Sequence, residues 1–335
     1  MTSSRPHTTE EPSRAPRRLV LATAFSSLFA GATPTHADAP SPALRGVRHR
    51  PRARGPLRAV STAATDWKSV GSALGHPGRM IGRDVYGVGF TRSDAHVVSQ
   101  GHAIKAIGSF VSFVRYEDGR TLMMGELAVT ETELQHVNDV VSAHGITLTS
   151  LHKHLFTQEP AIWWVHIHAI GSDPAELARG LRAVLDVTRI SRSSAGPDDV
   201  SVDLDTAGID RALGAKGRKQ GGVYKVTFAR NETVVEHDRA LPKMTGSTTA
   251  LVFQPVGSKK ALLSGDLVMT AREVPGTLRA LRKGRIDIVS LHNHMLADSP
   301  RLFFVHVWAV GDAVRLAGSL HPAVAGTNVA PADSI

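Results

Sequence analysis

The 335-residue sequence contains no cysteine. It therefore has no disulfide bond, no thiolate metal site and no cysteine nucleophile, and it offers no cysteine for lipid attachment after removal of a signal peptide. We infer that the protein is not lipidated and that packing alone stabilises its folded part. Aromatic residues are few, at 5% of the sequence, but hydrophobic residues make up 42%, a proportion typical of globular proteins.

No stretch of the sequence is long and apolar enough to span a membrane comfortably. The stretch LVLATAFSSLFAGA covers residues 19–32, and no later stretch reaches eighteen apolar residues. Arginines precede this stretch and small residues follow it, which is the pattern of a signal peptide cleaved before Asp38. We expect residues 1–37 to direct export to the extracellular space or the cell envelope, and no transmembrane span to remain after cleavage. The pair Arg17 and Arg18 is compatible with twin-arginine export, and the alternative is a basic leader that stays in the cytoplasm.

Positive charge is concentrated in the N-terminal part of the chain. The net charge is +9, but residues 1–60 hold ten arginines and three acidic residues, which leaves a net charge of +2 for the other 275 residues. That part of the chain has no basic stripe with interleaved aromatic residues, so we expect no nucleic acid as a partner. Residues 38–60 are rich in proline, arginine and glycine and are expected to form a flexible linker.

A histidine-rich segment occurs twice. Residues 150–171, SLHKHLFTQEPAIWWVHIHAIG, match residues 290–311, SLHNHMLADSPRLFFVHVWAVG, at nine of 22 positions and at an offset of 140. The upstream segments MMGELAVTETEL and LSGDLVMTAREV match at the same offset. Self-similarity at one period indicates a duplication, so we expect residues 61–190 and 201–330 to be two repeats that pack pseudo-symmetrically. The small, polar residues 191–200 are expected to link them.

Both repeats show the same order of expected elements. A short helix ends at Gly75 in the first repeat and at Gly214 in the second, because glycine suits a helix C-terminal cap. Alternating segments such as VYGVGF and GELAV indicate strands, and a further helix begins at the capping box Thr130–Glu133 or Thr270–Glu273. The hairpin and a last helix follow. The fold class expected for each repeat is therefore α+β, an antiparallel sheet with helices packed on one face.

The first histidine segment is expected to form a β-hairpin that turns at residues 159–160. Side chains two residues apart on a strand share a face, so His152 and His154 point the same way, as do His166 and His168. A register that pairs 154 with 166 and 152 with 168 brings all four imidazoles together, with Cβ atoms of opposite residues about 4.5–5.5 Å apart. This spacing suits the ligands of one metal ion.

The second repeat keeps three of these histidines and carries Trp308 in place of the fourth, and an acidic residue stands at matching positions on the preceding strands. Three imidazoles and a carboxylate suit a divalent transition metal, Zn²⁺, Fe²⁺, Mn²⁺ or Ni²⁺. The candidate ligands are His152, His154, His166 and Glu126 in the first repeat, with His168 as a fourth histidine ligand or a base, and His292, His294, His306 and Asp266 in the second.

Two functional hypotheses follow from this pattern. The first is an exported metal-binding protein whose metal could act as a Lewis acid or activate water in hydrolytic or oxidative chemistry. The second is a non-enzymatic envelope protein that binds a small molecule or an envelope component and whose histidines are structural or line a ligand pocket. The sequence contains no G-x-S-x-G, H-E-x-x-H, P-loop or G-x-G-x-x-G motif that would identify a reaction. The segment His152-x-His154…Glu159 resembles a cupin metal motif, but Glu159 falls in the turn and its counterpart is Ser299.

The duplicated motif S-L-H-x-H…P…V-H, with GELAVTETE and GDLVMTARE upstream, resembles the LppY/LpqO-type family of bacterial envelope proteins. The resemblance covers approximately residues 65–325. It implies an exported or envelope protein of a family without an assigned function, and it brings no catalytic residue to this chain. Named members look like lipoproteins, from which this sequence departs because it has no cysteine.

Overall fold

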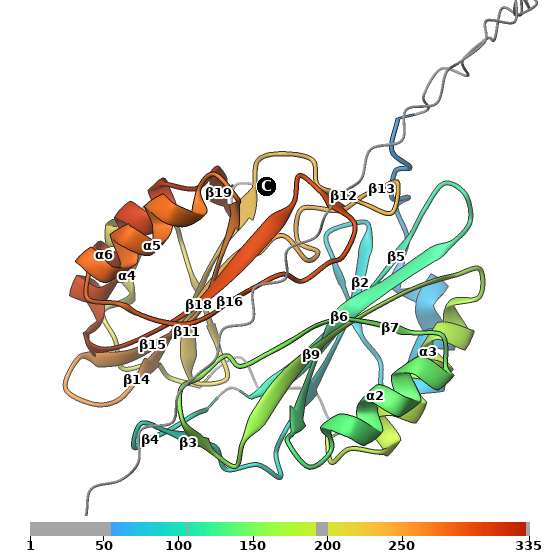
Figure 1. The fold of residues 1–335 in the computed structure, drawn as a ribbon, viewed down its shortest axis with the longest axis horizontal. Helices are drawn as coiled ribbons and strands as arrows, with labels where there is room; N and C mark the ends of the chain where they lie inside the picture. The colour runs from blue at the N-terminus through green and yellow to red at the C-terminus, as the bar shows by residue number, and fades with distance from the viewer. Residues whose placement is uncertain (1–54, 106, 192–199, 333–335) are drawn as a thin grey trace, which may run out of the picture. The chain divides into compact units, whose positions relative to one another are not determined.

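The computed structural model describes residues 55–105, 107–191 and 200–332 (Figure 1). Residues 54–335 form one compact unit that contains both repeats. The expected signal peptide, residues 1–37, lies outside the described residues, as do most of the two expected linkers. Among the helices of the described residues, none combines the length and the apolar character needed to cross a membrane.

The described part of the first repeat consists of short helices and antiparallel strands. Its helical elements are η1 (Ala64–Trp67), α1 (Lys68–Leu74), α2 (Leu134–Ala143) and α3 (Pro174–Asp186). Its strands are β1 (Arg79–Ile81), β2 (Val85–Thr91), β3 (Val98–Ser99), β4 (His102–Ala103), β5 (Gly108–Arg115), β6 (Thr121–Thr130), β7 (Thr147–His152), β8 (Gln158–Glu159) and β9 (Ile162–Gly171).

The second repeat follows the same order. Its helices are α4 (Thr206–Leu213), α5 (Val274–Lys283) and α6 (Ala313–Ala325). Its strands are β10 (Arg218–Gln220), β11 (Val223–Arg230), β12 (Val235–Glu236), β13 (Arg239–Ala240), β14 (Thr248–Pro255), β15 (Lys260–Thr270), β16 (Asp287–His292), β17 (Asp298–Ser299), β18 (Leu302–Asp312) and β19 (Val329–Pro331). Both short helices end as expected, since Gly75 and Gly214 adopt the left-handed conformation at their C-termini, with φ of 67° and 69°.

Each repeat contains one large antiparallel sheet. The strand order is β1-β2-β5-β6-β9-β7 in the first repeat and β10-β11-β14-β15-β18-β16 in the second, where β19 also pairs with β11. The hairpins β3-β4 and β12-β13 stand apart and form small sheets with β8 and β17. The expected fold class, a tandem pair of α+β domains with antiparallel sheets, is confirmed.

The helices of each repeat cover one face of its sheet (Figure 1). In the first repeat Leu74, Val137 and Leu181 of α1, α2 and α3 pack on Val165 and Ile167 of β9 in one hydrophobic core. The second repeat has an equivalent core in which helices α4 to α6 pack on β18. Since side chains alternate along a strand, the residues between these, including the histidines of β9, lie on the opposite face.

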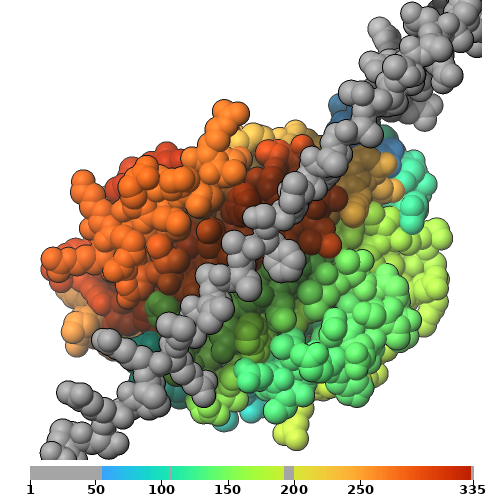
Figure 2. Space-filling view, viewed as in Figure 1, coloured from blue at the N-terminus to red at the C-terminus, as the bar shows by residue number. Residues whose placement is uncertain are grey.

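That opposite face is buried against the other repeat. One apolar cluster joins Leu122 and Met124 of β6 to Met295 and Phe304 of the second repeat, and another joins Trp164 and its neighbours to Leu262 and Trp308. The space-filling view shows the atoms of the two repeats in contact (Figure 2). The repeats are therefore two layers of one folded unit, with sheet facing sheet and helices outside.

Hydrogen bonds also cross between the repeats. The Thr149 hydroxyl donates to the carbonyl of His294 at 2.6 Å, and the Ser290 hydroxyl donates to the carbonyl of Lys153 at 2.9 Å. Residues 57–60, which the sequence assigns to a flexible linker, are held in place, which corrects that expectation. Leu57 exchanges backbone hydrogen bonds with the β12-β13 hairpin, and Val60 donates to Arg115.

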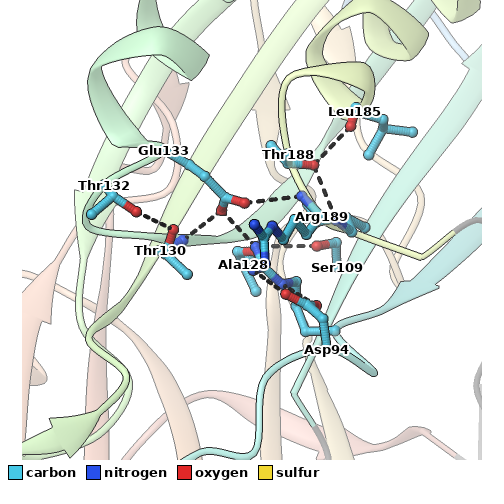
Figure 3. Close-up of polar contacts among 11 residues, drawn as sticks. Asp94, Ser109, Ala128, Thr130, Thr132, Glu133, Leu185, Thr188 and Arg189 are labelled. Carbon is cyan, nitrogen blue, oxygen red and sulfur yellow. Dashed lines mark hydrogen bonds and ion pairs between the residues drawn. The ribbon is translucent and has the colours of Figure 1, made fainter.

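A buried arginine in each repeat ties loops to the start of the second helix. The guanidinium of Arg92 is fully buried, donates twice to the carboxylate of Asp94, and donates to Glu133 Oε2 at 2.6 Å. Glu133 also accepts hydrogen bonds from the backbone N–H groups of Thr130 and Arg189 (Figure 3). In the second repeat Arg230, Glu232 and Glu273 make the same contacts.

This network corrects one detail of the sequence analysis. The helices were expected to begin at the capping boxes, but α2 begins at Leu134 and α5 at Val274, with Glu133 and Glu273 as the N-cap residues. The glutamate half of each box forms, because both carboxylates accept from the backbone N–H of the threonine three residues earlier. The same carboxylates also accept hydrogen bonds from Arg92 and Arg230. The sequence pattern of a capping box does not include these arginines.

We predict that Glu133→Gln lowers the free energy of unfolding by about 1–3 kcal/mol at pH 7, because a charged partner of a buried guanidinium is lost. Burial alone would raise the pKa of Glu133, but the hydrogen bonds from Arg92 and from two backbone N–H groups lower it. A carboxylate whose pKa is lowered by folding stabilises the protein above the unfolded-state pKa and loses this effect as the pH falls through the folded-state pKa.

Urea unfolding of the wild type and Glu133→Gln at several pH values measures this effect. The difference in unfolding free energy should be full above a pH of about 4.5 and should shrink below it. Glu117→Gln, which changes an exposed glutamate, is the control and should have little effect. An equal stability of Glu133→Gln and the wild type at pH 7 would contradict the prediction.

Candidate metal centre

The strand register places an acidic residue next to a histidine in both repeats. Glu126 of β6 lies opposite His166 of β9, and Asp266 of β15 lies opposite His306 of β18. The matching positions of acid and histidine expected from the sequence are therefore neighbours in the sheet. All four side chains are on the face turned away from the helices, because Val165 and its equivalents fill the helix-facing core.

The expected pairing within the hairpin is wrong by four residues. Instead of 154 with 166 and 152 with 168, the structure pairs Ser150 with His166 and His152 with Trp164, and a bulge follows Leu148. A shift by an even number of residues preserves the face on which a side chain lies, so His152 still lies on the side of His166. The second repeat has the same register, with Ser290 opposite His306 and His292 opposite Phe304.

His154 and His294 lie just beyond the ends of β7 and β16, and the ring of each points back towards the last histidine of its strand. The Nε2 atoms of His154 and His152 are 3.1 Å apart, and those of His294 and His292 are also 3.1 Å apart. The two repeats thus offer the same three histidines in the same arrangement.

The two histidine sets stack on each other across the interface between the repeats. Ring centroids are 3.4 Å apart for His152 and His292, 3.7 Å for His154 and His306, and 4.0 Å for His166 and His294. The pairs obey a pseudo-twofold relation, since exchanging the repeats converts the second pair into the third. We call this group the central cluster, and its members are His152, His154, His166, His292, His294 and His306.

Aromatic rings bound the central cluster on both sides. Trp164 stacks on His154 at a centroid distance of 3.9 Å, and Phe304, its equivalent in the second repeat, stacks on His294 at 3.4 Å. Both aromatic residues belong to the apolar clusters that join the repeats. The imidazoles therefore occupy the middle of the interface and are screened by apolar side chains at its ends.

The ligand atoms of the first repeat are spaced as they would be around one metal ion. Oε2 of Glu126 lies 3.5 Å from Nε2 of His154 and 3.4 Å from Nε2 of His166. Bonds of about 2.0–2.1 Å in a tetrahedral site put neighbouring ligand atoms about 3.3 Å apart. His152, His154 and His166 each bring a ring nitrogen within 4.8 Å of the other two, so the structure brings together the ligand set expected for this repeat.

The second group of converging nitrogens includes a histidine from each repeat. It consists of His152, His292 and His306, whereas the sequence analysis assigned the second site to residues of the second repeat alone. Asp266 lies farther from the nearest histidine nitrogen than Glu126 does in the first repeat, because its Oδ2 is 3.9 Å from Nε2 of His294. Since His152 belongs to both groups, the two candidate sites are adjoining parts of one cluster.

Two rings, those of His306 and His152, have a partner on Nδ1 that leaves Nε2 facing the cluster. The Nδ1–H of His306 donates to the carbonyl of Gly265 at 3.2 Å, so its Nε2 carries the free lone pair. This Nε2 atom is buried and, like Nε2 of His166, makes no hydrogen bond with the described residues. Nδ1 of His152 lies 3.2 Å from the Ser150 hydroxyl, which leaves its Nε2 facing the cluster. Partners of this kind on the far nitrogen are typical of metal-binding histidines.

Burial keeps the imidazoles neutral at pH 7. It lowers the pKa of His166 and of His292 to about 3. Burial, followed by the repulsion of neighbouring imidazoles, also lowers the pKa of the other four members of the central cluster. Burial raises the pKa of Glu126 to about 8, with a further contribution from Asp266, whose own pKa burial raises to about 7. The cluster therefore offers several lone pairs and no positive charge.

The cluster is more accessible from the first repeat. The side chain of Glu126 is 31% exposed and that of Asp266 is 13% exposed. A small ligand or water would therefore approach a bound ion beside Glu126 rather than beside Asp266.

His168 belongs to a different group. Its ring lies 5.0 Å from that of His237, at the tip of the β12-β13 hairpin of the second repeat, and a ring nitrogen of each converges with a carboxylate oxygen of Glu236. Sequence analysis missed Glu236 and His237, because no spacing signal shows which loop of one repeat reaches the sheet of the other.

Three solved structures of microcompartment shell proteins show a distant similarity to this chain, each with a TM-score of 0.18. The double-ringed trimeric shell protein MSM0271 of the RMM microcompartment is 13% identical and covers 62% of this chain and 81% of its own. The trimeric shell protein PduB is 13% identical over 74% and 92%, and EtuB from Clostridium kluyveri is 11% identical over 74% and 88%. At this TM-score the similarity supports no conclusion about the present chain.

No curated protein matches the chain in sequence. A family model does match, in two copies that cover residues 68–187 and 207–326. Both matches fall within the two repeats and together they include both strand pairs that carry the central cluster. The chain therefore belongs to the family described as Domain of Unknown Function (DUF1259), of which it contains two copies.

Proposed function

We propose that the protein binds a divalent transition-metal ion in the central cluster, with ligands from both repeats. The observation that carries this proposal is the convergence of buried, neutral imidazoles whose Nε2 atoms face one another, of which those of His166 and His306 make no hydrogen bond with the described residues. A buried polar atom without a partner is costly, and a metal ion would satisfy several such atoms at once.

The ligand types point to Zn²⁺, Fe²⁺, Mn²⁺ or Ni²⁺. Imidazole nitrogen with one carboxylate suits these ions, whereas Mg²⁺ and Ca²⁺ prefer oxygen ligands. The site of the first repeat, with Glu126 close to His154 and His166, supplies the more compact set. A cation would also offset the cost of burying the carboxylates of Glu126 and Asp266.

A bound ion at this site would supply Lewis-acid chemistry or an activated water molecule. The side chain of Glu126 is more exposed than those of His154, His166, His294 and Asp266. Glu126 would therefore lie where a substrate approaches, and its carboxyl group could accept or deliver a proton there. The competing function is a non-enzymatic envelope module that binds a small molecule or an envelope component. The stacking of His154 on Trp164 and of His294 on Phe304 favours it, because stacked neutral rings also serve as packing.

We further propose that the mature protein is exported and acts in the cell envelope or outside the cell, as the features of residues 1–37 and the similarity of the duplicated motif to LppY/LpqO-type proteins suggest. Intact mass measurement of the protein recovered from culture medium and envelope fractions tests this. The expected N-terminal residue is Asp38, and recovery of the full-length chain from the cytoplasm alone would contradict export.

We predict that His152→Ala binds at least one equivalent of transition metal less than the wild type, because His152 belongs to both groups of converging nitrogens. His154→Ala and His292→Ala each remove a ligand from one group and should lower the metal content less. Plasma mass spectrometry of the purified proteins measures the content. His136→Ala, which removes an exposed histidine of α2, is the matched control and should retain all the metal. Equal metal content in His152→Ala and the wild type would contradict the proposal.

We also predict that the metal stabilises the fold. At a free Zn²⁺ concentration 100 times the dissociation constant, binding to the native state alone adds about 2.7 kcal/mol to the free energy of unfolding. Thermal unfolding after chelation and after addition of Zn²⁺ measures this, and the same concentration of Mg²⁺ should have no effect. If neither Zn²⁺, Fe²⁺, Mn²⁺ nor Ni²⁺ raises the melting temperature of the chelated protein, the histidines are structural.

A further inference from the structure

A second group of candidate ligands lies outside the central cluster. His168 of β9, Glu236 of β12 and His237 of the following turn place two imidazole nitrogens and a carboxylate oxygen within 4.8 Å of one another. Nε2 of His237 is 3.8 Å from Oε1 of Glu236. The first residue belongs to the first repeat and the other two to the second, so the group forms only when the repeats pack together.

Two members of this group are buried polar groups that lack full hydrogen bonds. His168 is 6% exposed and Glu236 is 1% exposed. Nε2 of His168 and both carboxylate oxygens of Glu236 have no hydrogen-bond partner of good geometry among the described residues. The N–H groups of Leu296 and Ala297 lie near enough to lower the pKa of Glu236, but burial dominates and, with Asp298, raises it to about 7. Such groups are rare in folded proteins unless an unobserved partner satisfies them.

The pseudo-twofold relation between the repeats provides an internal comparison. The β3-β4 hairpin of the first repeat is the equivalent of β12-β13, and it carries Ser99 and Gln100 where the second repeat has Glu236 and His237. The equivalent of His168 is Trp308. All three ligand-type residues therefore occur together at one of the two equivalent places, and at the other place all three are different.

The turn that carries His237 presents it to solvent. His237 and Asp238 have φ of 44° and 64°, and a hairpin turn with two residues of positive φ usually contains asparagine or glycine. The equivalent turn in the first repeat has Gln100 and Gly101 at these positions. The side chain of His237 is 42% exposed, so an ion bound here would keep coordination positions open to solvent.

The positive charges near this group are already paired. Arg239, which lies close enough to lower the pKa of His168, donates to the carboxylates of Asp118 and Asp238. Arg301 pairs with Asp298 at 3.0 Å. Neither guanidinium donates a hydrogen bond to Glu236 among the described residues, so its carboxylate remains available.

We propose that His168, Glu236 and His237 form a second metal site that binds a divalent transition-metal ion through two imidazoles and one carboxylate. This ligand set with open positions is used for Fe²⁺ in oxygenases and for Zn²⁺ in hydrolases. The site is separate from the central cluster and does not depend on metal binding there. Because its ligands come from both repeats, it would also lock the β12-β13 hairpin against the first sheet.

The test uses Co²⁺ as the probe, titrated by equilibrium dialysis into the metal-free full-length chain. His237→Gly removes an exposed ligand and suits the positive φ of the turn, so the variant should fold. Glu236→Gln removes the negative charge and keeps the shape of the side chain. Gln100→Gly makes the same glycine substitution in the equivalent hairpin and is the matched control.

We expect His237→Gly and Glu236→Gln to bind one equivalent of Co²⁺ less than Gln100→Gly, or to bind that equivalent about 100-fold more weakly. A loss of about 100-fold is the upper end of the effect of removing a residue that only hydrogen-bonds to a metal ligand. The same comparison in the His152→Ala background isolates this site from the central cluster. Co²⁺ that remains bound in His152→Ala and is lost on adding His237→Gly supports the second site even if the central cluster binds no metal. Equal Co²⁺ binding by His237→Gly, Glu236→Gln and Gln100→Gly would overturn the proposal.

Discussion

The fold of this protein depends on covering the helix-free face of each sheet with the sheet of the other repeat. Each repeat has a sheet with helices on one face only, so its other face must be covered for the domain to be stable. The histidines stand in the middle of that uncovered face, and each finds a ring of the other repeat to stack on. The pair His152 and His292, at a centroid distance of 3.4 Å, lies at the centre. Neither repeat could bury its own histidines alone.

This arrangement explains why the interface contains polar rings where an apolar core would be simpler. The flanking apolar clusters, which include Trp164 on one side and Phe304 on the other, supply the hydrophobic burial. The imidazoles add little of it, and some of their nitrogens have no hydrogen-bond partner among the described residues. A structural role alone leaves that cost unexplained, whereas a bound ion would offset it.

Much of the architecture could be predicted from the sequence because it depends on local patterns. The constant offset of 140 residues revealed the duplication, and strand alternation assigned the histidines to one face. The hairpin register was wrong because the chain between His152 and Ile162 does not turn tightly at residues 159–160 but contains β8, which pairs with β3. The shift in register is four residues, an even number, so the face was right even though the neighbours were not. The helices α2 and α5 begin three residues later than the capping boxes indicate, although Glu133 and Glu273 still accept from the threonine N–H groups.

The sequence predicted that the repeats pack pseudo-symmetrically, but it did not predict which residues are in contact between them. Pattern analysis of one repeat shows which side chains share a face, but it does not show what will cover that face. The sequence pattern therefore assigned one metal site to each repeat. In the structure His152 belongs both to a group of ring nitrogens from the first repeat and to a group with His292 and His306 of the second repeat. For the same reason His168 was grouped with its neighbours in the sequence, and its partners Glu236 and His237 in the other repeat were not found.

The most direct test of the account is X-ray absorption spectroscopy of the purified protein at the edge of the metal that it retains. The account predicts a first shell of nitrogen and oxygen atoms at about 2.0–2.2 Å, with the outer-shell scattering of at least three imidazole rings. A first shell of oxygen atoms without imidazole scattering would contradict it, because an ion bound in that way would not be in the histidine cluster. A protein that retains no metal after reconstitution would contradict it as well.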